Sequence, residues 1–267
     1  MCGIAGFQSS INNKENIIAQ MMNTIKHRGP DDEGKAFFDD VTFGHVRLSI
    51  IDLEHGKQPF HSADGRYILI FNGEIYNYIE LRQHLNSKGY RLKTHSDTEV
   101  LLYMYAEYGK KLLDYLNGMF AFSIYDKAEK TLFLARDQFG IKPLYYFSSN
   151  DSFVFGSEIK AILKHPEVNA EVDQKSLQEY LTFQMVLKKH TLFKNINKLE
   201  PATYIIVKNK KIIEKKEYWN LSYEIDETKS QDQFADELLL LLENSLSLQI
   251  RSDVPVGAHL SGGIDSS

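Results

Sequence analysis

The residue best suited to nucleophilic chemistry in this 267-residue sequence is Cys2, its only cysteine, which follows Met1 in the stretch MCGIAGF. Removal of Met1 would give Cys2 a free α-amino group, whose reference pKa of about 8 suits a base that accepts the thiol proton. The nucleophile would then carry its own general base, as an N-terminal threonine does. The residues alone leave open the alternative that Cys2 is a small apolar residue at the start of a buried strand.

The stretch FNGEIYN, residues 71–77, offers hydrogen-bond donors for a developing negative charge. The side-chain amide of Asn72 and the backbone N–H of Gly73 could together hold an oxyanion. An Asn-Gly pair after an apolar run is also typical of a two-residue hairpin turn. The continuation YIELRQHL has a helical pattern, which weakens the hairpin interpretation.

Charged side chains in two further stretches could bind the two ends of an amino acid. In VRLSIID, residues 46–52, an alternating strand would place Arg47 and Ser49 on one face, and a guanidinium suits a carboxylate. In HSDTEV, residues 95–100, Asp97 could bind an ammonium group. The ordinary alternatives are an exposed arginine and an aspartate that only begins a helix.

The stretch LSGGIDSS, residues 260–267, has the composition of a phosphate-binding loop. Its two glycines let backbone N–H groups converge, and its serines add hydroxyl groups. It lacks the lysine of a Walker A loop. The preceding run VPVGAHL is typical of a strand, which argues against the alternative of a flexible tail.

The elements that must position these residues are strands in close succession, with helices in two groups. Strands are predicted at 3–8, 42–51, 66–71, 119–125, 131–136, 144–147, 152–156, 203–207, 211–216 and 254–260. Helices are predicted at 14–26, 78–87, Thr98–Tyr108 and Phe234–Ile250, with Ser96 and Glu99 spaced as a capping box and 27–34 as a loop. The pattern indicates an α+β protein with antiparallel sheets and no repeated βαβ unit.

Composition narrows the class of protein. Hydrophobic content of 43% and charged content of 25% are ordinary for a soluble globular chain, and a net charge of −5 predicts neither a nucleic-acid nor a membrane partner. One cysteine excludes an internal disulfide and fits a reducing compartment, so we expect a cytoplasmic protein without a signal peptide. No histidine or cysteine pattern has zinc-site spacing, so we expect no zinc site.

The motifs MCGIAGF, HRGPDDEG, HVRLSIID, NGEIYN, SDTEV, NGMFAF, RDQFGIKPLYY and SEIKAI, in this order, closely resemble the glutaminase domain of glutamine-hydrolysing asparagine synthetases. SGGIDSS resembles the pyrophosphate loop of their synthetase domain. The resemblance covers essentially the whole chain. It implies a four-layer αββα sandwich of the N-terminal-nucleophile hydrolase type over residues 1–215 and a linker over 216–230. Residues 231–267 would be the first helix and strand of an α/β ATP pyrophosphatase domain, truncated at the pyrophosphate loop.

The resemblance also assigns roles to residues. It implies that Cys2 is the nucleophile and that Asn72 and Gly73 form the oxyanion hole. It implies that glutamine is bound by Arg47 at its carboxylate, by Glu74 and Asp97 at its amino end, and by the backbone of Leu48, Ser49, Ile50 and Ile51. It implies that part of an ATP site is formed by Leu260, Ser261, Gly262, Gly263, Asp265 and Ser266.

The implied reaction is hydrolysis of glutamine to glutamate and ammonia through a thioester, without a cofactor. In the complete enzymes, ATP, Mg²⁺ and aspartate form β-aspartyl-AMP, which ammonia converts to asparagine. A homodimer is compatible with the resemblance.

One alternative is an amidotransferase with another acceptor, although purine- and amino-sugar-forming enzymes lack the SGGIDSS loop. Lasso-peptide cyclases and β-lactam synthetases share that loop but have less need of an intact glutamine pocket. Another alternative is a non-catalytic domain that binds glutamine as a sensor. The presence of Cys2 argues against this alternative. The acceptor site would lie beyond Ser267.

Overall fold

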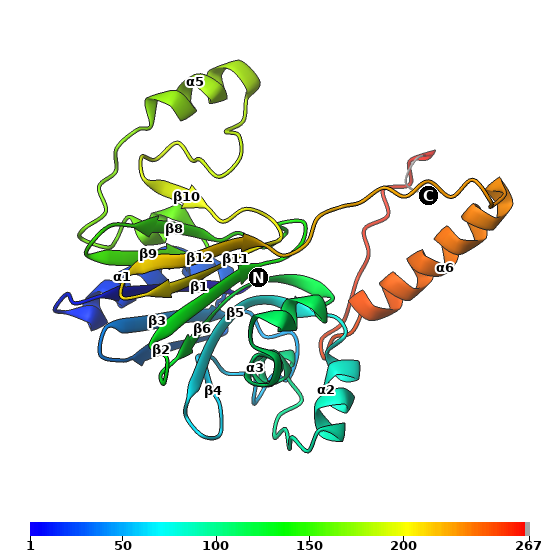
Figure 1. Ribbon diagram of the computed structural model, residues 1–267, viewed down its shortest axis with the longest axis horizontal. Coiled ribbons are helices and arrows are strands. Elements are labelled where there is room, and N and C mark those ends of the chain that lie inside the picture. The colour runs from blue at the N-terminus through cyan, green and yellow to red at the C-terminus, as the bar shows by residue number, and fades with distance from the viewer. Residues whose placement is uncertain (265–267) are drawn as a thin grey trace.

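The strand-forming segments build two antiparallel six-stranded sheets in the computed structural model, which describes residues 1–264 (Figure 1). Sheet A has the strand order β10 (Ile196–Lys198), β8 (Tyr145–Ser148), β9 (Ser152–Gly156), β1 (Gly3–Ser9), β3 (Val41–Arg47) and β2 (Asp32–Phe37). Sheet B has the order β12 (Lys211–Glu217), β11 (Thr203–Lys208), β7 (Thr131–Arg136), β6 (Gly118–Asp126), β5 (Tyr67–Ile75) and β4 (Phe60–His61).

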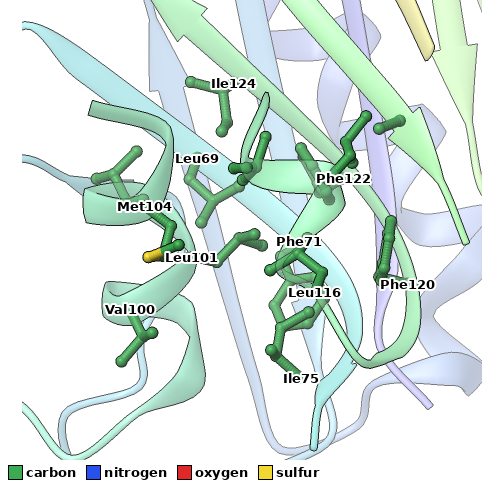
Figure 2. Packing of buried hydrophobic residues seen from close by; sticks show 14 of the residues in the cluster. Leu69, Phe71, Ile75, Val100, Leu101, Met104, Leu116, Phe120, Phe122 and Ile124 are labelled. Atoms are coloured by element: carbon green, nitrogen blue, oxygen red, sulfur yellow. The ribbon is translucent and has the colours of Figure 1, made fainter. Parts of the chain in front are cut away.

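Three buried apolar clusters separate four layers in the order helices, sheet A, sheet B, helices. On sheet A lie α1 (Lys14–Ile25) and the short α4 (Ile159–Ile162), and on sheet B lie α2 (Tyr78–Ser87) and α3 (Asp97–Tyr108). Figure 2 shows the second helical interface, where Leu101 and Met104 of α3 meet Phe71 and Phe122 of sheet B. Burial of each such side chain stabilises the fold by about 1.5–3 kcal/mol.

The central cluster lies between the two sheets. Ile4 and Phe43 of sheet A pack in it with Ile70 and Leu134 of sheet B, and all four are fully buried. Both sheets are thus covered on both faces, which explains why β1 is buried along its whole length, from Gly3 to Ser9. The layers form the αββα sandwich that the family resemblance implies, and they agree with the antiparallel α+β layers that the sequence patterns predict.

The helix predictions are confirmed to within three residues at each end as α1, α2, α3 and α6 (Gln231–Gln249). The capping box at α3 is only half formed. The Ser96 hydroxyl accepts the N–H of Glu99 at 3.2 Å, but the Glu99 carboxylate accepts the N–H groups of Lys93 and Thr94 instead of reaching back to Ser96. Glu99 therefore ties the preceding loop to the helix start.

Three other expectations are wrong. The strand predicted at 42–51 ends at Arg47, and the last part of the loop predicted at 27–34 begins β2. The run 254–260 forms no strand, because none of the described strands lies beside it to take its backbone hydrogen bonds. The sequence patterns also missed α5 (Gln174–Phe183), which projects beyond the sandwich (Figure 1). The last strand of sheet B ends at Glu217, just inside the predicted linker.

Helix α6 stands apart from the sandwich, and the chain after it returns toward α2 (Figure 1). A capping box between Ser230 and Gln233 fixes the start of α6. Leu238–Leu242 are each more than half exposed, so the described residues leave the helix without a partner. Among residues 1–264, no helix is long and apolar enough to span a bilayer.

A buried aspartate fixes the loop between β7 and β8. The Asp137 carboxylate accepts the backbone N–H groups of Phe120, Phe139, Ile141 and Lys142 at 2.8–3.2 Å, and Asp137 is 1% exposed. The guanidinium of the preceding residue, Arg136, donates to the carbonyl groups of Lys142, Leu199 and Gly140. The loop is therefore rigidly attached to β6 on one side and to β10 and its flank on the other.

We expect Asp137→Asn to lower the free energy of unfolding by about 2–4 kcal/mol. The NH₂ group of asparagine is a donor and cannot accept the backbone N–H hydrogen bonds that the replaced carboxylate oxygen accepts. The matched control is Asp151→Asn in the exposed turn between β8 and β9, for which we expect a change within about 0.5 kcal/mol. Denaturant unfolding of both variants measures the difference. Equal losses in the two variants would contradict this account of Asp137.

Candidate active site

One cavity gathers most of the residues that the sequence singles out. It lies where the ends of β1 and β3 in sheet A approach β5 in sheet B. The predicted residues in its lining are Cys2, Arg47, Leu48, Ile50, Ile51, Asn72, Gly73, Glu74 and Asp97. The lining residues that sequence reasoning missed are Met1, Gly56, Gln58, Phe71, Thr98, Met119 and Lys142.

The register of β1 against β3 places Cys2 beside the backbone of Leu48. Gly3 pairs with Val46, so the residue before β1 lies against the residue that follows β3. The Cys2 thiol is 3.4 Å from the Leu48 N–H nitrogen and 3.6 Å from the Leu48 carbonyl oxygen, and Arg28 Nε donates to the Cys2 carbonyl at 3.0 Å. Burial raises the pKa of the thiol, although the Leu48 N–H opposes the rise. A neutral thiol needs a base before it can attack.

The side chain of Asn72 is poised for a ligand. Asn72 lies within β5, which continues to Ile75, so the Asn-Gly pair is not a hairpin turn. Its residue is 1% exposed, and neither its amide nitrogen nor its amide oxygen has a hydrogen-bond partner among the described residues. A buried polar group without a partner costs about 1–3 kcal/mol, so a hydrogen-bonding group in the cavity would find its partner in Asn72.

Gly73 allows β5 to approach β6 closely beside Asn72. A Cβ atom on Gly73 would lie 2.2 Å from the carbonyl oxygen of Met119, which is backbone and cannot move aside. Asn72 and Gly73 pair with Ala121 and Phe120 in the ladder between β5 and β6. A side-chain donor is thus held on a paired strand in the lining of the cavity that also contains the thiol.

Two carboxyl groups line the same cavity, and both have raised pKa values. Burial, and after it the charge of Asp97, raise the pKa of Glu74 to about 7. Burial raises the pKa of Asp97 to about 6, although the N–H of Ile75 at 3.1 Å opposes the rise. Asp97 both begins α3 after the cap residue Ser96 and faces the cavity, so its two sequence interpretations are compatible. The pair favours a bound cation.

Arg47 shapes the loop that follows β3 and also lines the cavity. Its guanidinium donates to the carbonyl oxygens of Ile51, Asp52 and Leu53 at 2.7–3.1 Å, and the residue is 5% exposed. Gly56 permits this arrangement, because a Cβ there would lie 2.4 Å from an Arg47 nitrogen. Within the described residues these bonds use three of the five N–H groups, which leaves two for a ligand.

Ser49 does not line the cavity, although Leu48, Ile50 and Ile51 of the loop after β3 do. Because β3 ends at Arg47, strand alternation does not continue to Ser49. Its N–H instead donates to Asp31 Oδ2 at 2.8 Å on the outer side of the loop.

Two missed residues complete the cavity wall. Gln58 accepts the N–H of Phe71 at 2.6 Å and donates to Thr98 Oγ1 at 3.4 Å, which links β5 to α3. Lys142, in the RDQFGIKPLYY motif, is 5% exposed, and burial lowers the pKa of its amine while Glu74 opposes this. The motif itself was the available signal for Lys142, and no pattern marked Gln58.

The predicted ATP residues lie away from this cavity. Leu260, Ser261, Gly262 and Gly263 are exposed, and Gly262 has φ of 72°, which favours glycine. The Gly263 N–H donates to the Ser261 hydroxyl at 3.3 Å. Asp265 and Ser266 lie outside the described residues.

Comparisons with known proteins match two parts of the chain to two different families. Residues 1–219 match the family described as glutamine amidotransferase domain, and residues 237–267 match the family described as asparagine synthase. The chain is 43% identical over 272 residues to asparagine synthetase [glutamine-hydrolyzing] 1 of Bacillus subtilis, and 39% identical over 274 residues to number 3 of that organism. A putative asparagine synthetase of Methanocaldococcus jannaschii is 37% identical over 292 residues.

These relatives are longer than the chain. All of this chain aligns with 43%, 44% and 56% of their respective lengths, so it spans about half the length of the curated relatives it matches. Two solved structures resemble the fold, glutamine phosphoribosylpyrophosphate amidotransferase from B. subtilis and the allosteric regulatory enzyme of purine biosynthesis. Their TM-scores are 0.59 and 0.60 at 21% and 20% identity, over 82% of this chain and 49% of each of theirs. This likeness confirms the predicted αββα sandwich as the fold.

We expect the change in the free energy of unfolding caused by Glu74→Gln to be more favourable at pH 8 than at pH 4, measured without added ligand. The ordinary glutamate pKa of 4.5 rises to about 7 on folding, so the free energy of unfolding falls as the pH rises through this window and is level above it. Removing the ionisable group removes that penalty, which is about 1–3 kcal/mol.

Denaturant unfolding of wild type and Glu74→Gln at pH 4 and pH 8 gives the comparison. The difference between the two pH values isolates the ionisation from any packing change caused by the amide. A stability difference that does not change with pH would show that folding leaves the ionisation of Glu74 unaffected.

Proposed function

Because the chain belongs to the glutamine amidotransferase domain family, and is thus an enzyme of the amidotransferase type, we propose that the cavity hydrolyses glutamine through a thioester on Cys2. The observation that carries the proposal is the buried, unpartnered amide of Asn72 in the same cavity as the only thiol of the chain. Together with the Gly73 N–H it supplies donors for the oxyanion of a tetrahedral intermediate.

The charges of the cavity suit the zwitterionic end of glutamine. The two remaining N–H groups of Arg47 would bind its carboxylate in a charge-assisted pair. Glu74 and Asp97 would bind its ammonium group, whose positive charge favours the ionised form of both carboxyl groups. The ammonium group would therefore offset the unfavourable effect of the Asp97 charge on the ionised form of Glu74.

The proposed reaction begins once Met1 is removed. In the structure the nitrogen of Cys2 is in a peptide bond with Met1, which lies at the cavity wall. With the amine free, it would accept the thiol proton while sulfur attacks the side-chain amide carbon of glutamine. The C–N bond then breaks, the amine returns a proton to the leaving nitrogen, and ammonia departs. A water molecule attacks the thioester, which releases glutamate and restores the thiol.

We further infer that residues 1–219 are the glutaminase unit of a longer enzyme that uses the ammonia to make asparagine from aspartate. This inference rests on the names of the relatives and on the second family match at 237–267. Leu260–Ile264 contain two glycines and a serine, a composition of the type found in phosphate-binding loops, which fits ATP with Mg²⁺ as its counter-ion. The role that we propose for residues 260–264 is to contribute to binding a phosphate group.

We expect a glutamine-analogue electrophile such as diazo-oxo-norleucine to add once, at Cys2, in protein that has lost Met1. Intact mass and peptide mapping locate the adduct, and a glutaminase assay follows loss of activity in Cys2→Ala. Full activity in that variant, or labelling elsewhere, would refute the proposal. Glutamine binding without hydrolysis by wild type would favour the alternative of a sensor.

We expect Asn72→Ala to lower kcat by roughly 10²–10³, because an oxyanion donor acts on charge that exists only in the transition state. Glu74→Gln should chiefly raise KM, because its contact with the ammonium group exists in ground and transition states alike. Steady-state kinetics of the two variants separates the roles. The assignment fails if Asn72→Ala changes only KM.

A further inference from the structure

The segment after α6 makes specific contacts with the sandwich although α6 itself makes none that bury it (Figure 1). The Arg251 guanidinium donates to both carboxylate oxygens of Glu80 on α2, at 2.6 and 2.7 Å, and to the Tyr76 carbonyl oxygen at 2.8 Å. Asp253 lies two residues further on and contacts a different part of the molecule. We name residues 251–253 the clasp.

Asp253 binds the loop after β3 through both its backbone and its side chain. Its N–H donates to the Ile50 carbonyl oxygen at 3.0 Å, and its carboxylate accepts the Asp52 N–H at 2.7 Å. The two bonds bracket Ile51, which lines the candidate active site together with Ile50. The clasp therefore binds the loop between β3 and β4, residues 48–59, which we name the pocket loop.

The bond from Asp253 leads directly to the groups proposed to bind glutamine. The Asp52 carbonyl oxygen accepts Arg47 Nη2 at 2.7 Å. The Asp52 carboxylate accepts the N–H of His95 at 2.7 Å, two residues before Asp97. One residue thus connects the clasp, the guanidinium for the substrate carboxylate and the start of the helix that carries the carboxyl group for the ammonium.

Asp52 depends on this support because of its backbone. Its φ of 48° lies in the left-handed region, which is unfavourable for a residue with a Cβ atom. The conformation persists only where surrounding hydrogen bonds fix it. Loss of the Asp253 acceptor would free the Asp52 N–H and relax the loop on which Arg47 depends.

We propose that Arg251 and Asp253 are positioning residues for glutamine binding, acting through Asp52 and the pocket loop. The proposal rests on the proposed glutaminase function. It makes the segment that leads from α6 to the glycine loop at 260–264 a determinant of glutamine affinity. A displacement of that segment would be transmitted to Arg47 over two hydrogen bonds.

The kinetic experiment compares variants of the full chain. Asp253→Ala should raise the KM for glutamine about 5–10-fold with kcat within about twofold of wild type, which is the effect expected from loss of one charge-assisted hydrogen bond that shapes a binding site. Asp253→Asn, which keeps an acceptor oxygen for the Asp52 N–H, should stay within about twofold in KM. Arg251→Met should raise KM about 2–3-fold, because its pair with Glu80 is partly exposed.

The control is Asp236→Ala on the exposed part of α6, which removes the same charge without touching the pocket loop and should leave both constants unchanged. A KM for Asp253→Ala equal to that of the control would overturn the proposal. So would an equal KM rise in Asp253→Asn and Asp253→Ala, or a loss in kcat at unchanged KM.

A second measurement is independent of activity. Amide exchange at Asp52 and His95 should be faster in Asp253→Ala than in wild type or Asp236→Ala, while exchange in β1 and β6 stays unchanged. Unaltered exchange at both amides would overturn the positioning role even if glutamine were hydrolysed. Absence of glutaminase activity in wild type would instead refute the proposed function, and the exchange result would still decide whether the clasp holds the loop.

Discussion

The face-to-face packing of the two sheets is the constraint on which the site depends. Cys2 and Arg47 belong to the ends of strands in sheet A, whereas Asn72 and Glu74 belong to β5 in sheet B. A buried hydrogen bond of 3.1 Å between His45 Nε2 on β3 and the Phe71 carbonyl oxygen on β5 joins the two sheets one residue before Asn72. Burial lowers the pKa of His45 to about 4, so the imidazole crosses the interface uncharged. Any sliding of one sheet on the other would separate the thiol from the proposed oxyanion donors.

The cavity brings several buried polar groups together in unfavourable surroundings. The carboxylate of Asp137, by contrast, is buried with several hydrogen-bond donors around it. In the cavity, Asn72 has none among the described residues, and Glu74 and Asp97 lie together with raised pKa values. A ligand with an ammonium group and a carbonyl oxygen would resolve both defects. This energetic disadvantage would be the counterpart of selectivity for the amino acid that we propose to bind here.

The pocket loop after β3 connects these two features to the rest of the chain. Arg47 holds the loop from the inside, and Asp253 holds it from the outside through Asp52. Because both contacts act on the same short run of backbone, the loop is a single unit whose shape is shared between the sandwich and the segment after α6. This arrangement gives a distant segment a physical route to the substrate site without any contact with substrate.

The sequence by itself determined the kinds of element and the chemistry of individual residues. The apolar stripe of α1, the strand runs and the unique cysteine follow from local periodicity and composition, and the ordered motifs point to Cys2, Asn72 and Asp97 through their resemblance to a known family. Local patterns could not decide where β3 ends, so they place Ser49 on one strand face with Arg47. The strand ends at Arg47, and Ser49 does not line the cavity. They also could not find Gln58 or Asp253, whose roles arise from hydrogen bonds to backbone far away in the chain. Such contacts exist only when the sheets pack, because the partners lie between 13 and 201 residues apart and are brought together by burial of apolar surface, which periodicity does not encode pair by pair.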